Sequence, residues 1–187
     1  MPFAPSVRQG AALGAVVAAF AFAPATSEAA GCADADTMPT SENVATVRTA
    51  TLCLLNHVRR QHQRHALRSN TSLEAVAQRY SEQMVTQRFF DHVSPAGSTF
   101  VQRVRTTDYL SNASTWSLGE NLAWGSGYYG TPRETVRGWM HSPGHRHNIL
   151  EPRYREIGIG IAPRAPVDVG GVQGATYTTD FGKRTRR

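Results

Sequence analysis

The chain has 187 residues and a formal net charge of +6 at pH 7, and its length suits one domain with a sizeable hydrophobic core. Four of the positive charges lie in residues 183–187, and setting them aside leaves +2, which is too little for a domain that neutralises nucleic-acid phosphates. We therefore expect no specific nucleic-acid partner. Residues 183–187 are interpreted as a solvated basic tail that anionic cell-envelope polymers attract.

Residues 1–29 have the pattern of a secretory signal peptide. Arg8 precedes an apolar run of 14 residues, 10–23, and the small-x-small sequence of residues 27–29 follows as a cleavage site. The run is too short to cross a bilayer comfortably, so we expect no transmembrane span in the mature chain. An uncleaved anchor and a lipoprotein acylated at Cys32 are the alternatives, although the leucine usual three places before such a cysteine is missing.

The chain contains two cysteines, Cys32 and Cys53. An oxidising compartment outside the cell favours their pairing, which predicts a disulfide that ties the segment after the leader to the first helix. Closing this loop should stabilise the fold by about 3 kcal/mol. Two free thiols, or an acylated Cys32 beside a buried Cys53, are the other interpretations.

Two helices are predicted in the first half of the chain. Residues 30–43 are small, polar and proline-bearing, and are interpreted as a tether. Apolar residues then recur at three- and four-residue intervals over residues 44–58, which predicts an amphipathic helix. A second helix should begin with a capping box formed by Thr71 and Glu74 and close at Phe89-Phe90. We expect the two helices to pack together as an antiparallel layer.

The middle of the chain alternates between loops and short helices. Residues 91–97 are rich in turn formers and precede a third, shorter helix near residues 100–104. Residues 111–117 have the composition of a loop, and Glu120 then follows within an otherwise apolar run. Thr131-Pro132 predicts the start of another helix, with Trp139 on its buried side.

Three histidines follow Trp139 within eight residues, beside a forced break in the backbone. Ser142 precedes Pro143 and is therefore disfavoured in a helix, so the preceding helix should end near His141. A new helical turn should begin near His145 and bury the apolar residues that follow. We interpret His141 and His147 as surface residues and expect His145 to be the functional histidine.

Two strands are predicted near the C-terminus. Residues 156–161 alternate glycine with isoleucine, and residues 175–181 alternate and are β-branched. Too few residues separate them for a crossover helix, which predicts a hairpin. Helices before this hairpin indicate an α+β domain, in which helices cover an antiparallel sheet.

His92, Glu120 and His145 are the residues best suited to chemistry. Two imidazoles and a carboxylate with an open fourth position would suit zinc or a similar divalent metal. Alternatively, His92 is a hydrogen-bonded loop histidine and Glu120 a structural carboxylate fixed by backbone amides. A nucleophile at Ser142 or Ser94 is disfavoured because no Gly-x-Ser-x-Gly elbow is present.

Five motifs in fixed order resemble the bacterial branch of the CAP superfamily, which includes the cysteine-rich secretory proteins, antigen 5 and the plant pathogenesis-related proteins. The motifs are Phe90-Asp91-His92-Val93-Ser94-Pro95, Gly119-Glu120-Asn121-Leu122-Ala123, residues 139–150, Glu156-Ile157-Gly158-Ile159-Gly160 and Thr179-Asp180-Phe181-Gly182. The resemblance implies a three-layer α-β-α sandwich with a central antiparallel sheet over residues 44–182. It also implies export and a cleft lined by two histidines and two glutamates.

Matched motif by motif, His92, Glu120 and His145 take three of the four cleft positions. The second glutamate position falls at Ser142, so one carboxylate is missing. The resemblance favours a monomeric protein, secreted or associated with the cell envelope, whose cleft binds a divalent metal or a small or lipid-like ligand. The alternative is a metal-dependent hydrolase acting on peptide or cell-wall substrates, with zinc activating water.

Overall fold

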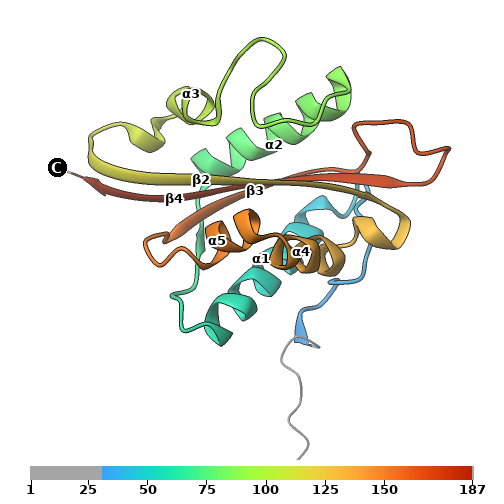
Figure 1. Cartoon of the computed structure of the whole chain (residues 1–187), viewed down its shortest axis with the longest axis horizontal. Coiled ribbons are helices and arrows are strands. Elements are labelled where there is room, and N and C mark those ends of the chain that lie inside the picture. The colour runs from blue at the N-terminus through green and yellow to red at the C-terminus, as the bar shows by residue number, and fades with distance from the viewer. Residues whose placement is uncertain (1–30, 187) are drawn as a thin grey trace, which may run out of the picture.

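The computed structural model describes residues 31–186, and the predicted signal peptide lies outside them. In chain order the elements are α1 (Val44–Gln61), β1 (Arg68–Ser69), α2 (Thr71–Gln87), α3 (Phe100–Arg105), η2 (Asp108–Leu110), β2 (Ala113–Ser126), η3 (Gly127–Gly130), α4 (Pro132–His141), α5 (Pro143–Leu150), β3 (Glu156–Ala162) and β4 (Gly174–Arg186). The strands of this region form one sheet in the order β1-β3-β4-β2. Helices α2 and α3 cover one face, and α1, α4 and α5 cover the other (Figure 1). The expected three-layer α-β-α sandwich is confirmed.

The long strands are antiparallel, as predicted, and the hairpin of β3 and β4 is present. The two-residue strand β1 runs parallel to β3, so the sheet is mixed rather than wholly antiparallel. Strand β2 lies at the far edge of the sheet, beside β4. The candidate glutamate therefore lies on an edge strand, where residues from both helical layers can reach it.

The alternation of glycine and isoleucine in β3 gives its two faces different partners. The three isoleucines are buried in the main core, which also contains Trp139 from α4. On the other face, a Cβ at Gly158 or Gly160 would overlap the backbone of Leu73 or Ala77. Because glycine has no Cβ, α2 packs directly on the strand.

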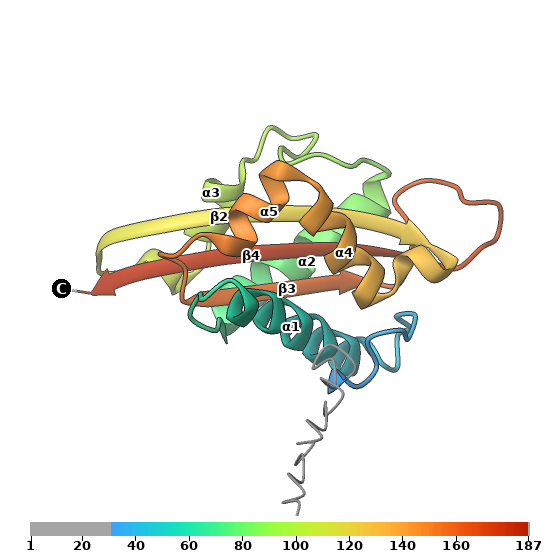
Figure 2. The same cartoon turned by 60° about the horizontal axis from the view of Figure 1, so that its bottom comes forward.

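The prediction that the first two helices form one layer is wrong. Figure 2 shows α1 in front of the sheet and α2 behind it. Each helix buries its apolar side on a different face of β3, and the periodicity of a single helix does not say which face it covers. The predicted capping box of α2 is also wrong, because the Asn70 side chain caps this helix by accepting from the backbone N–H groups of Ser72 and Leu73.

Two segments expected to be irregular belong to the sheet. Residues 113–117, interpreted as a loop, form the start of β2, and residues 183–186, interpreted as a tail, form the end of β4. The two pair with each other, for example Trp116 with Arg184. Backbone pairing needs no apolar side chains, so the polar composition of both segments concealed it.

The segment before α1 packs against the domain and does not resemble a free tether. Cys32 and Ala35 are buried in the main core. The predicted disulfide between Cys32 and Cys53 is present, with Cα atoms 5.8 Å apart. The carboxylate of Asp36 also pairs with Arg133 at the start of α4. Residues 31–43 therefore link α1 to α4 across the surface of one layer.

Candidate functional site

The three candidate residues come from three different parts of the fold. His92 lies in the loop after α2, Glu120 in the middle of β2, and His145 in the first turn of α5. Successive residues of a strand point to opposite faces, so Glu120 faces α2 and α3 whereas Asn121 faces α5. Asn121 donates to the backbone carbonyl of His145 at 3.1 Å. Asn148 donates to the carbonyl of Glu120, also at 3.1 Å, and this pair of bonds fixes α5 against β2.

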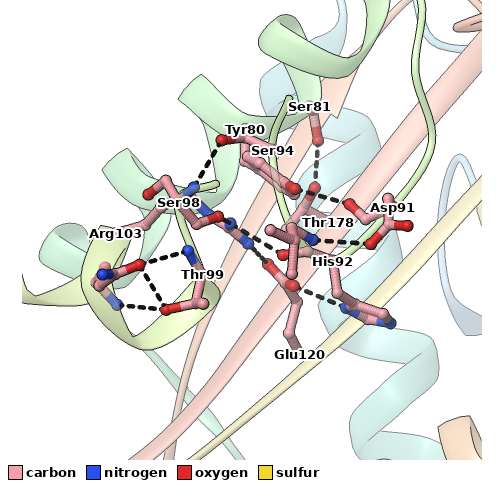
Figure 3. A network of polar contacts seen from close by, with 12 residues as sticks. Tyr80, Ser81, Asp91, His92, Ser94, Ser98, Thr99, Arg103, Glu120 and Thr178 are labelled. Carbon is pink, nitrogen blue, oxygen red and sulfur yellow. Dashed lines mark hydrogen bonds and ion pairs between the residues drawn. The ribbon is translucent and has the colours of Figure 1, made fainter. Parts of the chain in front are cut away.

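The Glu120 carboxylate is almost fully buried, and both of its oxygens are engaged (Figure 3). Nδ1 of His92 lies 2.8 Å from Oε1, and the Arg103 guanidinium donates to Oε2 at 2.6 Å. Arg103 also donates to the His92 carbonyl at 3.1 Å and lies 3.3 Å above the ring of Tyr80. Arg103 thus holds the carboxylate and the histidine loop together, and sequence reasoning missed it.

The two imidazoles have opposite electrostatic environments. The hydrogen bond to Glu120 raises the pKa of His92, because it favours the charged ring. Burial lowers the pKa of His145, and the nearby His92 adds to the effect. At a pH near 6.5, His92 therefore carries more positive charge than His145. His92 is then the more cationic of the two rings, and His145 is the better hydrogen-bond acceptor.

Asp180 is a second buried carboxyl group next to Glu120. The two residues are directly paired across β4 and β2, and Asp180 is fully buried. Neither of its oxygens has a donor within residues 31–186. Burial raises the pKa of Asp180 well above its ordinary value, and the Glu120 charge raises it further. A protonated Asp180 can donate to Glu120, which accounts for the missing donor.

A groove of about 310 Å³ extends from His145 along the edge strand. Its walls are aromatic and include Phe90, Trp124, Tyr129 and Trp139. Trp139 is fixed by a 2.9 Å hydrogen bond to the Leu122 carbonyl. The rings of Phe90, Trp124 and Tyr129 remain exposed. The apolar walls of the groove are thus partly open to solvent and end at an imidazole.

Ser142 lies in this groove, together with a carboxylate that the motif comparison missed. Glu134 is buried, forms an ion pair with Arg137 and lines the groove with Gly138 and Ser142. These residues are four apart on α4 and its C-cap, so they share one side of the helix. The i, i+4, i+8 spacing of these three residues in the sequence could have indicated that Glu134 lies on the same side of the helix as Ser142. The groove therefore contains a glutamate, two helical turns before the position at which the family pattern has one.

The residues do not fit the three-ligand metal site considered above. Within residues 31–186, no group of three or more His, Cys, Asp or Glu side chains is arranged to hold a metal ion. The Arg103 guanidinium already occupies one oxygen of Glu120, and a fixed cation there opposes a divalent ion. His92 and His145 alone fall short of the three protein ligands typical of zinc enzymes.

The remaining polar candidates have structural roles or lie at the surface. The Ser94 hydroxyl is buried and accepts from the backbone N–H of Ser98, so it shapes the loop that carries His92. His141 and His147 are exposed, as expected, and Nδ1 of His141 bonds to the Arg137 carbonyl of its own helix.

An α-β-α sandwich with a polar His/Glu cleft on its edge strand defines a CAP-type domain. The model of the cysteine-rich secretory protein family, CAP, matches residues 52–176, and the chain belongs to this family. The protein YkwD of Bacillus subtilis, described as uncharacterized, is 33% identical over 141 residues, which are 74% of this chain and 49% of that protein. The uncharacterized membrane protein YlbC of the same organism is 30% identical over 110 residues, 59% of this chain and 30% of that protein. The chain thus spans half or less of the length of these relatives.

Solved bacterial structures have the same fold. An extracellular protein with an SCP domain from Bacillus anthracis matches with a TM-score of 0.59 and 22% identity, covering 76% of this chain and 43% of that one. An outer surface protein from Borrelia burgdorferi also matches with a TM-score of 0.59, at 21% identity, covering 79% of this chain and 96% of that one. In the part of this chain that the structure describes, no helix combines the length and apolarity needed to cross a membrane.

Proposed function

We propose that the protein is an extracellular binding module whose cleft, formed by His92, Glu120, Ser142 and His145, takes a small amphipathic or lipid-like ligand. The aromatic groove that ends at His145 carries this proposal. Its volume of about 310 Å³ is at the lower end of the range for small-molecule sites. The apolar part of a ligand would lie along the rings, and its polar end would meet the imidazoles.

The polar end of the cleft favours binding over metal-dependent hydrolysis. Both oxygens of Glu120 are engaged by His92 and Arg103, so the carboxylate is not free to act as a base or a ligand. Its bond to His92 leaves Nε2 of that ring for a ligand oxygen. His145, with its lowered pKa, complements it as an acceptor. A polar head that both donates and accepts, such as an alcohol or a carboxylic acid, matches this pair.

Binding of decanol and decanoate, followed by NMR, tests the proposal. Trp124→Ala removes one wall of the groove and should weaken binding by about tenfold. Trp116→Ala is the matched control, because Trp116 lies on the same strand and is exposed to a similar degree, 44% against 40% for Trp124. An equal effect of the two substitutions, or no binding of either probe, would reject the proposal. Tight stoichiometric zinc binding that shifts both imidazoles would instead support the hydrolase alternative.

A further inference from the structure

A basic pocket of about 690 Å³ lies at the other end of the sheet from the aromatic groove. It is lined by Arg68, Arg155, Lys183, Arg184 and Arg186, together with Glu156 and His65. Figure 2 shows the C-terminal end of β4, where three of these residues lie, far from the opposite end of the sheet, where β2 leads into η3. This pocket is therefore separate from the cleft described above.

The fold assembles these cations from three distant parts of the chain. Parallel pairing of β1 with β3 places Arg68 opposite Glu156, and Glu156 is in turn opposite Gly182 of β4. The following residues of β4 are held in register by β2, with Arg186 opposite Ala113. Residues that looked like a loose tail are thus fixed on a strand.

Two of the guanidinium groups are anchored in place by backbone carbonyls. Arg155 donates to the Tyr154 carbonyl at 2.9 Å through Nη1. Arg184 donates to the Tyr109 carbonyl, also through Nη1, and lies 4.4 Å from the centre of the Tyr109 ring. Each group keeps further N–H donors for a ligand. Anchored groups lose less conformational entropy when they bind.

The positive charge of the pocket is poorly compensated. Glu156 already accepts hydrogen bonds from Asn70 at 2.9 Å and from the Tyr109 hydroxyl at 2.7 Å, and its oxygen lies 3.8 Å from Arg184. Within residues 31–186, no ion pair is found for Arg68, Lys183 or Arg186. Five cations around one hollow with a single, engaged carboxylate produce a focused positive potential.

We propose that this pocket binds the phosphate groups of a soluble linear phosphate polymer. Guanidinium groups match phosphate oxygens in charge and in the spacing of their N–H donors. The cations line a hollow rather than a flat face. A linear polymer can enter such a hollow, whereas the flat surface of a bilayer fits it poorly. The site is independent of the proposed cleft, since the two share no residue.

Binding of long-chain inorganic polyphosphate to the full chain, measured by calorimetry at several salt concentrations, tests this site. The double variant Arg68→Gln/Arg186→Gln should weaken binding at least tenfold. It should also reduce the slope of log K against log salt by about 1.5, because two fewer phosphates are neutralised. Both side chains are exposed, so the double variant should keep the native fold. Decanol binding equal to that of the native chain would show that the fold is kept.

The matched control is Arg79→Gln/Arg105→Gln, which removes the same charge from exposed positions on α2 and α3. We expect it to keep most of the affinity. Equal losses in the two double variants would show that only net charge matters and would overturn the proposal. So would absent polyphosphate binding, or tighter binding to phosphatidylglycerol vesicles than to polyphosphate, which would indicate a membrane surface.

Discussion

Glu120 is held by a cation from α3 and a histidine from the preceding loop, and its side chain is only 2% exposed. A carboxylate in such surroundings is costly unless its charge is compensated. Arg103 supplies that compensation and is itself mostly buried. The pair is therefore a structural requirement of the cleft as well as a part of its chemistry.

Replacing Arg103 by Met should lower the free energy of unfolding by about 3 kcal/mol at pH 7, since it leaves Glu120 buried without its partner. Urea unfolding measures this loss. Arg105→Met, at an exposed position of the same helix, should have little effect. Adding Glu120→Gln to the Arg103 variant should recover part of the stability, and a purely additive double variant would contradict the account.

The two cleft histidines should titrate on opposite sides of the ordinary histidine pKa near 6.5, His92 above it and His145 below it. NMR titration of the ring protons measures both. Glu120→Gln should remove the upward shift of His92. The His92–Glu120 bond should stabilise the fold fully below about pH 6.5 and lose its effect as the pH rises through the raised pKa of His92. A His92 pKa unchanged by the glutamine would exclude this pairing.

Asp180→Asn should stabilise the protein at neutral pH. The native chain retains a proton on Asp180 that the unfolded chain releases above about pH 4, so its stability falls as the pH rises towards the raised pKa of Asp180. The loss is up to about 1.4 kcal/mol per pH unit. Asparagine donates to Glu120 without this dependence. In thermal unfolding, the stability of Asp180→Asn relative to the native chain should increase as the pH rises. Asp168→Asn, on an exposed loop, should show the same pH dependence as the native chain.

At the scale of elements, the N-terminal segment depends on one covalent link. The Cys32–Cys53 disulfide closes a separation of 21 residues and holds Cys32 and Ala35 in the main core. The double variant Cys32→Ser/Cys53→Ser should lose about 3 kcal/mol of unfolding free energy. Denaturant unfolding with and without reductant measures it, and reductant should have no effect on the variant. A native protein equally insensitive to reductant would contradict this role.

Sequence patterns predicted the elements more reliably than their contacts. The start of α4, its end before Pro143 and the β3–β4 hairpin follow from local rules about proline and alternation. The placement of α1 and α2 on opposite faces does not, because amphipathic periodicity shows that a face is buried but not against what. For the same reason the sequence did not indicate a role for Asp180, because that role depends on its pairing with Glu120 on the neighbouring strand.

The cleft itself was predictable only in part. His92, Glu120 and His145 stand out as polar residues in apolar surroundings, and their motifs resemble a known family. Arg103 looked like any basic residue of a short amphipathic helix. Its role became visible only in three dimensions, where its guanidinium meets Glu120 and Tyr80. The sequence could not show this, since a carboxylate in a motif does not reveal which groups already occupy its oxygens.

At the scale of the whole molecule, the paired strands β2 and β4 run through both candidate sites. Trp116 and Trp124 lie near opposite ends of β2, and the eight residue steps of extended strand between them span about 26 Å. This ladder is continuous across the register from Ser126 with Gly174 to Thr115 with Thr185. The middle of this ladder is buried between the two helical layers, so that part should bend little.

A stiff pair of strands fixes the orientation of the aromatic groove relative to the basic pocket. If the basic pocket binds a phosphate polymer, the aromatic groove would lie a few nanometres from that polymer, facing the surrounding solution. A ligand bound in the aromatic groove would therefore be held away from the phosphate polymer.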